Sequence, residues 1–562
     1  MLIGIDVGGT FTDAVAVKNG RVLAWYKSKT SPEDLLGSLL SALDGVLRET
    51  GGERPERVTF STTLVTNLIV EKKYEPAALI LIPGPGLNPD DYPFGEGVWV
   101  VEGAIDYRGR EIVPLNREQV RQAALQAREA GYRKIAVVGK FSQRNNAHEN
   151  QALEIITSVY PEAEIFLGHE VSGQLNFPRR AATTRYTAAT ASRVRDFCRA
   201  VQAALRERKI DAPAFVLKAD GSSLPLEIVE KWPLETVYSG PAASALGVLA
   251  MTPPGETTVV IDIGGTTTDL ALILSGFPLL SSRGAVVEGI NTSVRSLAVR
   301  SLPLGGDSPL LLREGRVELG QQRQGPARAA GGPVPTLTDA LNVLGLARYG
   351  DVEASRTALE DLARLSGQEG GEDLARQAVE QAVATVKRGV DEMFLAWEQE
   401  PAYRVWEVMQ PRRERPRNVA GVGGGSLGMA EAVAQALGCR PLTVPYAPVA
   451  NAVGAAVARP TVTVTLRLDT ERGIFSVLEE GYQGTLSRSG RFGEEDALNL
   501  AREWLERRRQ RLGVDDAGEE EITEKEVFNV VRGWVTTGRI YQITLQSGRG
   551  ILTWVIGGEV NG

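Results

Sequence analysis

An eight-residue pattern occurs twice in this chain, at residues 6–13 and again at residues 262–269. Both copies read D-x-G-G-T-x-T-D, and each stands between two short apolar runs. Glycine accepts the backbone angles of a tight turn, so an apolar run on either side of a glycine pair predicts strand, turn, strand. The pattern therefore predicts two β-hairpins with the same turn. A dinucleotide fingerprint or a Walker loop would instead lead from a strand into a helix.

The residue types in the two turns suit an anion. Paired glycines let backbone N–H groups approach an anion closely, and the threonine hydroxyls add donors. The first aspartate stands at a strand end, where a carboxylate can hold a hydrated Mg²⁺. Two such hairpins facing each other would hold a triphosphate from both sides. Ordinary hairpin turns also use D-G-G and G-G-T, but two copies in one strand context favour the phosphate-binding interpretation.

Length and charge narrow the class of protein. The chain has 562 residues, 43% of them hydrophobic and 23% charged, which is typical of a globular enzyme with several domains. A net charge of −8 gives no basic surface for nucleic acid. The chain starts directly with an apolar strand and has no run of membrane-spanning length. We therefore expect a cytoplasmic protein without nucleic-acid or membrane partners.

Cysteine and histidine are scarce. Two cysteines, Cys198 and Cys439, and two histidines exclude a zinc site of the usual spacing. One alternative stays open, because two cysteines per subunit can bridge an iron–sulfur cluster across a homodimer, as in some ATP-driven reductase activators. Neither cysteine stands in a glycine-flanked loop, and small buried thiols are the favoured interpretation.

Strand and helix patterns alternate along most of the chain, which predicts an α/β fold. We predict domains at residues 1–175, 176–254, 255–459 and 460–562. The last of these reads as a small α+β appendage with an acidic, loop-like stretch at 515–526. The main predicted strands are 58–60, 77–82, 134–139, 165–167, 214–218, 418–422, 462–468, 527–535 and 539–545, and the main predicted helices are 116–130, 180–208, 373–398 and 494–511.

Other glycine-rich segments are candidate sites. The strand at 418–422 runs into Gly423, Gly424, Gly425 and Ser426 and then a helix, which suits a phosphate or the ribose and base of a nucleotide. Ser239, in Ser-Gly-Pro-Ala, is a helix N-cap or an anion contact, with capping favoured. The Gly/Pro-rich stretch at 305–335 reads as a flexible linker or as a specific feature of the protein.

From residue 2 to about 458 the chain resembles the hydantoinase/oxoprolinase family, in particular its ATP-binding A-type subunit. The order of phosphate hairpin, phosphate hairpin and glycine-rich nucleoside motif is that of the actin, sugar-kinase and heat-shock-chaperone superfamily. Further segments are similar to family patterns: 61–67 to G-T-T-x-x-T-N, 106–111 to D-x-R-G-R-E, 145–149 to N-x-x-H-E, 169–172 to H-E-V-S, 239–242 to S-G-P-A and 335–340 to P-T-x-T-D-A.

The resemblance implies a two-lobed, actin-like ATPase fold of duplicated ribonuclease-H-like units. It also implies a reaction in which ATP phosphorylates the carbonyl oxygen of a cyclic amide, such as a hydantoin, oxoproline or lactam, before the ring is opened. A B-type partner subunit or a homo-oligomer is expected. Two alternatives remain: an ATP-dependent ketone carboxylase component, and an ATP-driven switch that activates a partner protein.

The resemblance also assigns residues. Asp6 and Asp262 would orient Mg²⁺ and act at the reacting phosphate. The expected ATP contacts are Gly8, Gly9, Thr10 and Thr12 at one end of the phosphate chain, Gly264, Gly265, Thr266 and Thr267 at the other, and Gly423, Gly424, Gly425 and Ser426 at the nucleoside. The candidate substrate contacts are Asp106, Arg108, Arg110, His148 and Glu149. A salt bridge within a turn is the alternative for the two arginines, and a helix cap is the alternative for His148.

The chain departs from the family pattern at three places. A usual G-G-G-S segment is here 305–308, with Asp307 as a candidate catalytic, metal or substrate residue or a local loss of function. The usual cysteine-tyrosine-glycine segment is replaced by residues 328–330. The tail after residue 459 does not resemble the larger C-terminal domain of full-length relatives, and that difference bears on the partner interface and the reaction.

Overall fold

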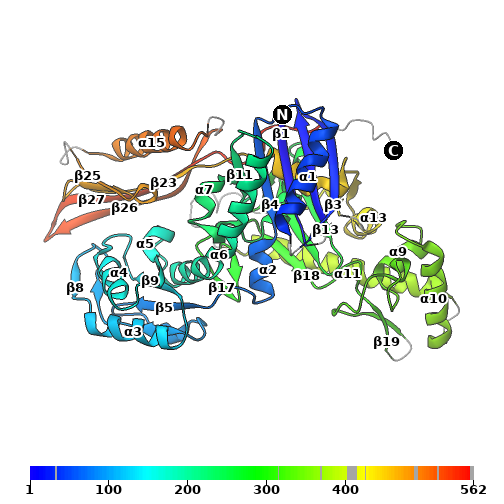
Figure 1. Ribbon diagram of the computed structural model, residues 1–562, viewed down its shortest axis with the longest axis horizontal. Coiled ribbons are helices and arrows are strands. Elements are labelled where there is room, and N and C mark those ends of the chain that lie inside the picture. Colours follow the sequence, from blue (N-terminus) through cyan, green and yellow to red (C-terminus); the bar gives the residue numbers. More distant parts are fainter. Residues whose placement is uncertain are drawn as a thin grey trace.

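Two sheets built to the same plan form the centre of the molecule (Figure 1). The computed structural model describes residues 1–9, 11–31, 34–313, 316–367, 370–400, 414–423, 426–486, 492–514 and 518–556. In each sheet an antiparallel hairpin lies beside two parallel strands. The predicted two-lobed α/β fold is therefore confirmed, and both repeated octapeptides form hairpins as expected.

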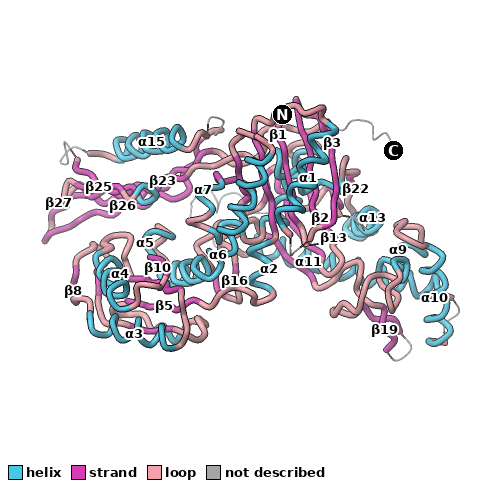
Figure 2. The backbone as a smooth tube through the Cα atoms, in the orientation of Figure 1, coloured by secondary structure: helices cyan, strands magenta, loops and turns pink. Residues whose placement is uncertain are grey.

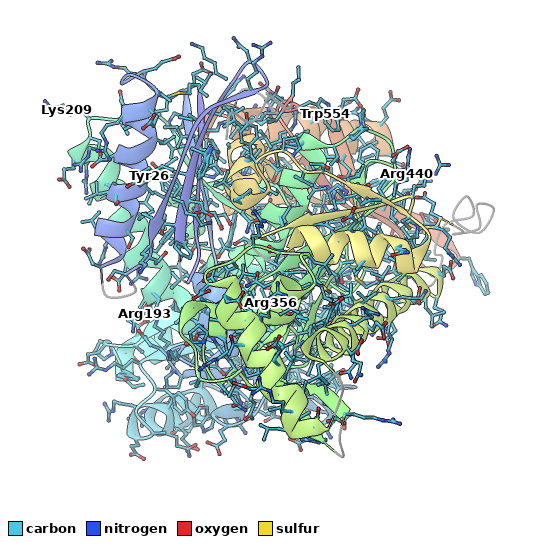
Figure 3. The ribbon with its side chains drawn as sticks, turned by 90° about the vertical axis from the view of Figure 1, so that its right-hand side faces the viewer. Tyr26, Arg193, Lys209, Arg356, Arg440 and Trp554 are labelled. Atoms are coloured by element: carbon cyan, nitrogen blue, oxygen red, sulfur yellow. The ribbon has the colours of Figure 1, made fainter. Side chains whose placement is uncertain are left out.

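The first lobe is a six-stranded sheet of order β12-β11-β4-β1-β2-β3. Its strand β1 is buried from Ile3 to Val7 and is apolar except for Asp6, as expected for a central strand covered from both sides. Helix α1 lies beside this sheet, and Tyr26 of β3 lies over Gly45 of α1 (Figure 3). The elements are β1 (Leu2–Val7), β2 (Phe11–Lys18), β3 (Arg21–Lys29), β4 (Arg57–Thr62), β11 (Ala214–Leu217), β12 (Ser223–Pro225), α1 (Leu35–Glu49) and α2 (Leu64–Val70).

The second lobe repeats this arrangement in the order β15-β14-β13-β21-β22, with β18 also paired to β14. Helices α9, α10 and α11 and the hairpin β19–β20 extend from it to the far end of the molecule (Figure 1). The elements are β13 (Thr258–Ile263), β14 (Thr268–Leu274), β15 (Phe277–Pro278), β18 (Val299–Leu302), β19 (Leu310–Arg313), β20 (Arg316–Leu319), β21 (Asn418–Val422), β22 (Arg440–Leu442), α9 (Leu337–Val343), α10 (Val352–Ser366), α11 (Gly371–Glu398) and α13 (Ser426–Leu437).

Two small-residue helices, α8 (Ser239–Met251) and α14 (Ala450–Val457), lie between the two sheets. Helix α14 packs on β1, β2 and β4, whereas α8 contacts β13, β14 and β21. Their backbones touch: a Cβ on Gly247 would lie 2.1 Å from the Ala450 carbonyl oxygen, and one on Gly454 2.0 Å from that of Ala243. The two lobes are therefore joined through a glycine-dependent helix crossing.

A separate α/β unit is inserted between β4 and β11 of the first sheet and has the strand order β10-β9-β5-β6. Figure 2 shows its helices around the sheet, at the opposite end of the molecule from α10. The long helix α6 (Phe177–Glu207) leads from this unit back to the first lobe. The other elements of this unit are β5 (Ala77–Ile82), β6 (Val98–Val100), β7 (Ala104–Ile105), β8 (Glu111–Val113), β9 (Lys134–Gly139), β10 (Glu164–Leu167), α3 (Arg117–Glu129), α4 (Ala147–Val159) and α5 (Gly168–Val171). Helix α7 (Leu226–Val229) and the strands β16 (Val286–Val287) and β17 (Ile290–Asn291) pack instead on the core of the first lobe.

The C-terminal part is a five-stranded antiparallel sheet covered by one helix, which confirms the expected α+β appendage. The predicted acidic loop at 515–526 is wrong from Glu520 onward, because that segment pairs with the last strand. Residues 515–517 lie outside the described residues. The elements are β23 (Thr463–Asp469), β24 (Ile474–Val477), β25 (Tyr482–Thr485), α15 (Glu494–Arg511), β26 (Glu520–Arg532) and β27 (Val535–Ser547).

The predicted domain boundaries at 175, 254 and 459 stay a prediction. Within the described part of the chain, no helix combines the length and the apolar character needed to cross a membrane.

Candidate functional site

The two hairpin turns close in the same way. The Gly8 N–H donates to the Phe11 carbonyl at 3.0 Å, and the Gly264 N–H donates to the Thr267 carbonyl at 2.9 Å. Gly9 and Gly265 are exposed between these bonds. Because the same hydrogen bond closes both turns between the same kinds of strand, the two copies of the sequence pattern form the same local structure. The predicted phosphate contact Thr10 lies outside the described residues.

The threonines of the two turns differ in exposure. Thr266 and Thr267 are exposed in the second turn. Thr12 is fully buried, and its hydroxyl lies 2.9 Å from that of Thr30. The hydroxyl of Thr12 is thus already bonded within the lobe, and its role as a phosphate contact stays a prediction.

Asp6 and Asp262 end the strands before the two turns, and the fold brings them into electrostatic contact. Burial raises the pKa of the Asp6 carboxyl to about 7; the charges of Asp13 and Asp262 also raise it, while the neighbouring polar side chains of Ser61 and Asn451 lower it. The Oδ1 atom of Asp6 is buried and has no hydrogen-bond partner among the described residues. An unpartnered carboxylate oxygen suits a hydrated cation, although the described residues contain no group of three or more His, Cys, Asp or Glu side chains that could hold a metal ion directly.

Asp262 is held by side chains from the two crossing helices. Ser244 of α8 places its hydroxyl 2.5 Å from Asp262 Oδ2 and 2.8 Å from Asn451 Oδ1, which belongs to α14. Burial raises the pKa of Asp262, and the bonds to Ser244 and Asn451 together with the charge of Lys27 oppose that rise. The helix crossing therefore positions the carboxylate of the second hairpin.

Lys27 of β3 is a cation close to both hairpins. Its ammonium lies 2.8 Å from Asp13 Oδ2, 3.2 Å from the Pro448 carbonyl and 5.1 Å from the centre of the Phe11 ring. Burial raises the pKa of Asp13, while the hydrogen bond and charge of Lys27 lower it. Ser61, Ser244, Asn451 and Lys27 were not predicted as site residues, because only the folded chain brings them to the hairpins.

The glycine-rich exit from β21 runs directly beside the second hairpin. Gly423 has a φ of +88°, and a Cβ there would lie 2.8 Å from the Ile263 carbonyl oxygen and 3.0 Å from Asp262 Oδ1. Both the positive φ and the lack of room for a Cβ atom require glycine at this position. Gly424 and Gly425 lie outside the described residues, as does the side chain of Ser426 at the start of α13, so their contact with a nucleoside stays a prediction.

Asp307 lies on the second hairpin. The Gly306 N–H donates to the Gly264 carbonyl at 2.9 Å, and the Asp307 N–H donates to the Gly265 carbonyl at 2.7 Å. The Asp307 carboxylate pairs with Arg323 at 2.9 Å. The described part of the 305–335 stretch is thus tied to the hairpin turn, and the flexible-linker alternative is wrong.

The predicted substrate residues of the D-x-R-G-R-E segment form a self-contained turn. The Nε of Arg110 donates to Asp106 Oδ2 at 2.7 Å, and the backbone N–H groups of Arg108 and Arg110 both donate to Asp106 Oδ1 at 2.9 Å. This is the turn salt bridge that was the alternative to substrate binding. Figure 1 places β8, which follows this turn, far from β1 and β13.

His148 and Glu149 take part in two separate contacts. His148 Nε2 lies 2.8 Å from Glu111 Oε1, and α4 is capped at Asn146, so the helix-cap alternative for His148 is wrong. Glu149 is fully buried and accepts the N–H of Gly139 at 2.7 Å and that of His169 at 2.9 Å. Burial raises the pKa of Glu149, but the bonds from His169 and Gly139 outweigh it and the net shift is downward.

The remaining candidates have structural partners. Ser239 is buried, donates to the Thr62 carbonyl at 2.7 Å and is the first residue of α8 after its cap Tyr238, so it is neither a cap nor an exposed anion contact. Cys198 is buried with its sulfur 3.8 Å from the Leu226 carbonyl oxygen, and burial raises its pKa to about 12. Cys439 is half-buried. A thiol enclosed like that of Cys198 does not reach a surface where two subunits would share a cluster.

The family model described as hydantoinase/oxoprolinase matches residues 180–464, and its N-terminal region model matches residues 2–160. The chain belongs to the hydantoinase/oxoprolinase family. The resemblance predicted from the motifs is confirmed.

Curated relatives in this family are distant. The caprolactamase subunit alpha of Pseudomonas jessenii is 23% identical over 377 residues, which are 61% of this chain and 54% of that protein. The acetophenone carboxylase gamma subunit of Aromatoleum aromaticum is 26% identical over 393 residues, covering 61% of this chain and 53% of that protein. The chain therefore spans about half the length of the curated relatives it matches.

Two solved structures share the fold. Nucleotide-free acetone carboxylase superposes with a TM-score of 0.72 at 18% identity, covering 99% of this chain and 88% of that one. The ATP-dependent caprolactamase from Pseudomonas jessenii superposes with a TM-score of 0.68 at 19% identity, covering 97% of this chain and 86% of that one. These likenesses extend the family fold to the C-terminal sheet.

Proposed function

We propose that this hydantoinase/oxoprolinase family member is an ATP-dependent enzyme, or the ATP-binding subunit of one, that phosphorylates the carbonyl oxygen of a cyclic amide before the ring is opened. The observation that carries the proposal is the pair of matching hairpins, whose carboxylates Asp6 and Asp262 interact electrostatically beside a helix crossing. Relatives named caprolactamase subunit alpha and 5-oxoprolinase support the amide substrate. Relatives named as subunits support a partner subunit.

The hairpins are suited to positioning and charge neutralisation, which is what phosphoryl transfer requires of a protein. Gly9, Gly265 and Thr266 expose donors where the phosphate chain would lie. Asp6 and Asp262 would hold a hydrated Mg²⁺, because Mg²⁺ takes one or two carboxylates together with waters and phosphate oxygens. That ion would neutralise charge on the phosphates.

The chemistry balances with two water molecules. The amide oxygen attacks the γ-phosphorus, the bond to the β-phosphate oxygen breaks, and ADP leaves. Water then adds to the activated carbon, and the ring C–N bond breaks as the nitrogen takes up a proton, leaving an acyl phosphate. A second water releases phosphate and the carboxylate. An amide is a poor electrophile; phosphorylation of its oxygen activates the carbon for attack by the first water, and phosphate is the leaving group when the second water reacts.

The test is phosphate release from Mg·ATP by the purified chain in the presence of hydantoin, 5-oxoproline or caprolactam. We expect one ring to stimulate release, and we expect Asp262→Asn to abolish it. Asp361→Asn, on the exposed side of α10, is the matched control and should leave release unchanged. ATP binding without stimulation by any cyclic amide, alone or with a partner subunit, would refute the amide proposal.

A ketone carboxylase component is the second candidate. It is favoured by the fold shared with acetone carboxylase and by the 26% identity to an acetophenone carboxylase subunit. A requirement for bicarbonate distinguishes the ketone carboxylase function from the cyclic-amide function. Phosphate release that needs both a ketone and bicarbonate would assign carboxylation, whereas release with a cyclic amide in bicarbonate-free buffer would assign ring opening.

A further inference from the structure

A cavity of about 940 Å³ lies where four parts of the chain meet. Its walls come from the α5–α6 junction, the end of β11, the segment 280–295 and the C-terminal sheet. None of the residues predicted to bind ATP or substrate lines it. Figure 1 shows α5, α7 and β23 near one another, with β17 of the 280–295 segment below α6. The cavity is therefore a candidate site that the motifs do not assign.

Lys218 of the cavity wall lies at the same end of the first sheet as the turn of the first hairpin. Lys218 follows the last residue of β11, which runs parallel to β4, which in turn runs parallel to β1. Val216 of β11 pairs with Phe60 of β4, which pairs with Ile5 of β1. Two residues further along each strand, Lys218 is therefore level with Val7 of the hairpin. Two strand spacings place the two backbones roughly 10 Å apart.

The cavity has hydrogen-bond donors in excess. Within the described part of the chain, the guanidinium of Arg179 has no hydrogen-bond or ion-pair partner. Arg295 donates Nη1 to Gln546 Oε1 at 2.7 Å, and its nearest paired carboxylate, Glu521, is 3.9 Å from Nη2. Gln546 is 1% exposed, and its Nε2 has no partner among the described residues; the same holds for the buried Ser293 hydroxyl.

Three acidic side chains of the wall, in contrast, are engaged, whereas the buried Oε2 of a fourth, Glu526, has no hydrogen-bond partner among the described residues. Glu235 lies 3.3 Å from the Lys218 ammonium, and the backbone N–H of Thr465 donates to Glu479 at 2.7 Å. Glu524 accepts from two neighbouring side chains of β27. Burial raises the pKa of all three carboxyls, which favours their uncharged form. Two further glutamates line the cavity: Glu526 stands beside Arg144, and Glu170 is exposed at the rim.

The start of a long helix adds positive potential. Helix α6 has 31 residues, and its first turn, with the cap Asn176 and Arg179, lines the cavity. The unpaired N–H groups of a helix N-terminus carry about half a positive charge and favour anions. Arg180, the next residue, is buried and donates to the Gly139 carbonyl at 2.7 Å, so it fixes this first turn.

We propose that this cavity is a binding site for a small organic carboxylate, held by Arg179 at the start of α6 and by Arg295 from the wall beside the C-terminal sheet. An ionised carboxylate has only hydrogen-bond acceptors, and it could therefore bind the unpartnered donors of the cavity wall. The site goes beyond the proposed function, because the carboxylate need not be the molecule that ATP phosphorylates. It is either part of the substrate or product, or an effector that joins the four parts of the chain.

The test is isothermal titration calorimetry on the full chain without nucleotide, using glutarate and its uncharged analogue glutaramide. We expect glutarate to bind and glutaramide to bind at least tenfold more weakly. Arg179→Met should weaken glutarate binding about 10- to 100-fold, since one charge-assisted contact contributes about 1.5–3 kcal/mol. Arg179→Lys should recover part of the loss, because it keeps the charge.

Arg193→Met is the matched control. Arg193 is an exposed arginine of the same helix, labelled in Figure 3, and lies roughly 21 Å further along its axis. We expect its glutarate affinity to equal that of the wild type. Equal binding of glutarate and glutaramide, or an unchanged affinity in Arg179→Met, would overturn the proposal.

Two further arms separate the sources of the carboxylate. Consumption of a carboxylate-bearing ring such as 5-oxoproline, with a KM raised by Arg179→Met, would make the site part of the substrate pocket. A changed rate of ATP hydrolysis with the carboxylate left intact would make it an effector site. Because binding is measured without nucleotide, its failure is distinguishable from failure of the proposed reaction.

Discussion

Replacing Asp6 by asparagine is expected to stabilise the nucleotide-free protein, and increasingly so as the pH rises from 5 to 8. The pKa of Asp6 is raised from 3.8 to about 7 in the folded chain. The folded state therefore binds more protons than the unfolded state between these pH values, and the free energy of unfolding falls as the pH rises through that window. Below pH 3.8 both states are protonated, and the carboxyl has no such effect.

The size of the effect follows from the shift. One pKa unit corresponds to about 1.4 kcal/mol, so the carboxylate destabilises the folded chain by about 1.6 kcal/mol at pH 5 and by about 4 kcal/mol at pH 8. Asparagine cannot ionise. We therefore expect the stability advantage of Asp6→Asn over the wild type to grow by roughly 3 kcal/mol across this range.

Hydrogen–deuterium exchange of the β1 and β2 amides is the assay, because it reports local opening free energies in a protein with several domains. Asp44→Asn is the control. Hydrogen bonds from Arg208 lower the pKa of Asp44, so this carboxylate is ionised in both states above pH 5 and its effect should not change with pH. An Asp6→Asn advantage that stays constant from pH 5 to 8 would refute the reasoning.

Three further predictions concern the same region. The affinity for Mg·ATP should fall about tenfold per pH unit below pH 7, because protonation removes the Asp6 carboxylate, and titration calorimetry from pH 5.5 to 8 measures this. Lys27→Met should destabilise the first lobe by on the order of 1–3 kcal/mol in urea unfolding, since it leaves the buried Asp13 carboxylate unpaired. Gly247→Ala should lower the melting temperature by several degrees or prevent folding, because its Cβ would lie 2.1 Å from the Ala450 carbonyl oxygen.

Matched variants control the last two predictions. Lys231→Met removes an exposed lysine and should leave urea unfolding unchanged. Gly370→Ala adds a Cβ at a position with no atom within 4 Å and should melt like the wild type. If Lys27→Met or Gly247→Ala behaved like its control, the corresponding contact would not stabilise the protein.

Local sequence patterns predicted the framework well. Apolar runs around glycine pairs located both hairpins, and helical periodicity located α11 and α15 with the correct last residues. The strand β26 was missed at its acidic start, because an edge strand can expose charged side chains and its pairing with β27 is set by the partner strand. A local sequence pattern does not show which strand another strand will pair with.

The candidate site was predicted only in part, for a related reason. The hairpin carboxylates stand in a recognisable motif, whereas Ser244, Asn451 and Lys27 reach them only through tertiary packing. Charged motifs can also have local partners: Asp106 and Arg110 bond to each other within one turn, and their role as substrate contacts stays a prediction. Arg179 gave no sequence signal, because its significance lies in a cavity whose walls come from four distant segments.

The crossing of α8 and α14 determines how the lobes can move. Backbones in contact at Gly247 and Gly454 have no side chains between them to deform, so sliding along either helix would drive alanine methyl groups into a carbonyl. Rotation about the contact, in contrast, would keep the two touching backbones at the same distance. Ser244 and Asn451 sit at this pivot and hold Asp262. The turn of the second hairpin would therefore rotate about the Asp262 carboxylate. Such a rotation would change the contacts of the turn with the phosphate chain, while the carboxylate proposed to bind the cation would move little.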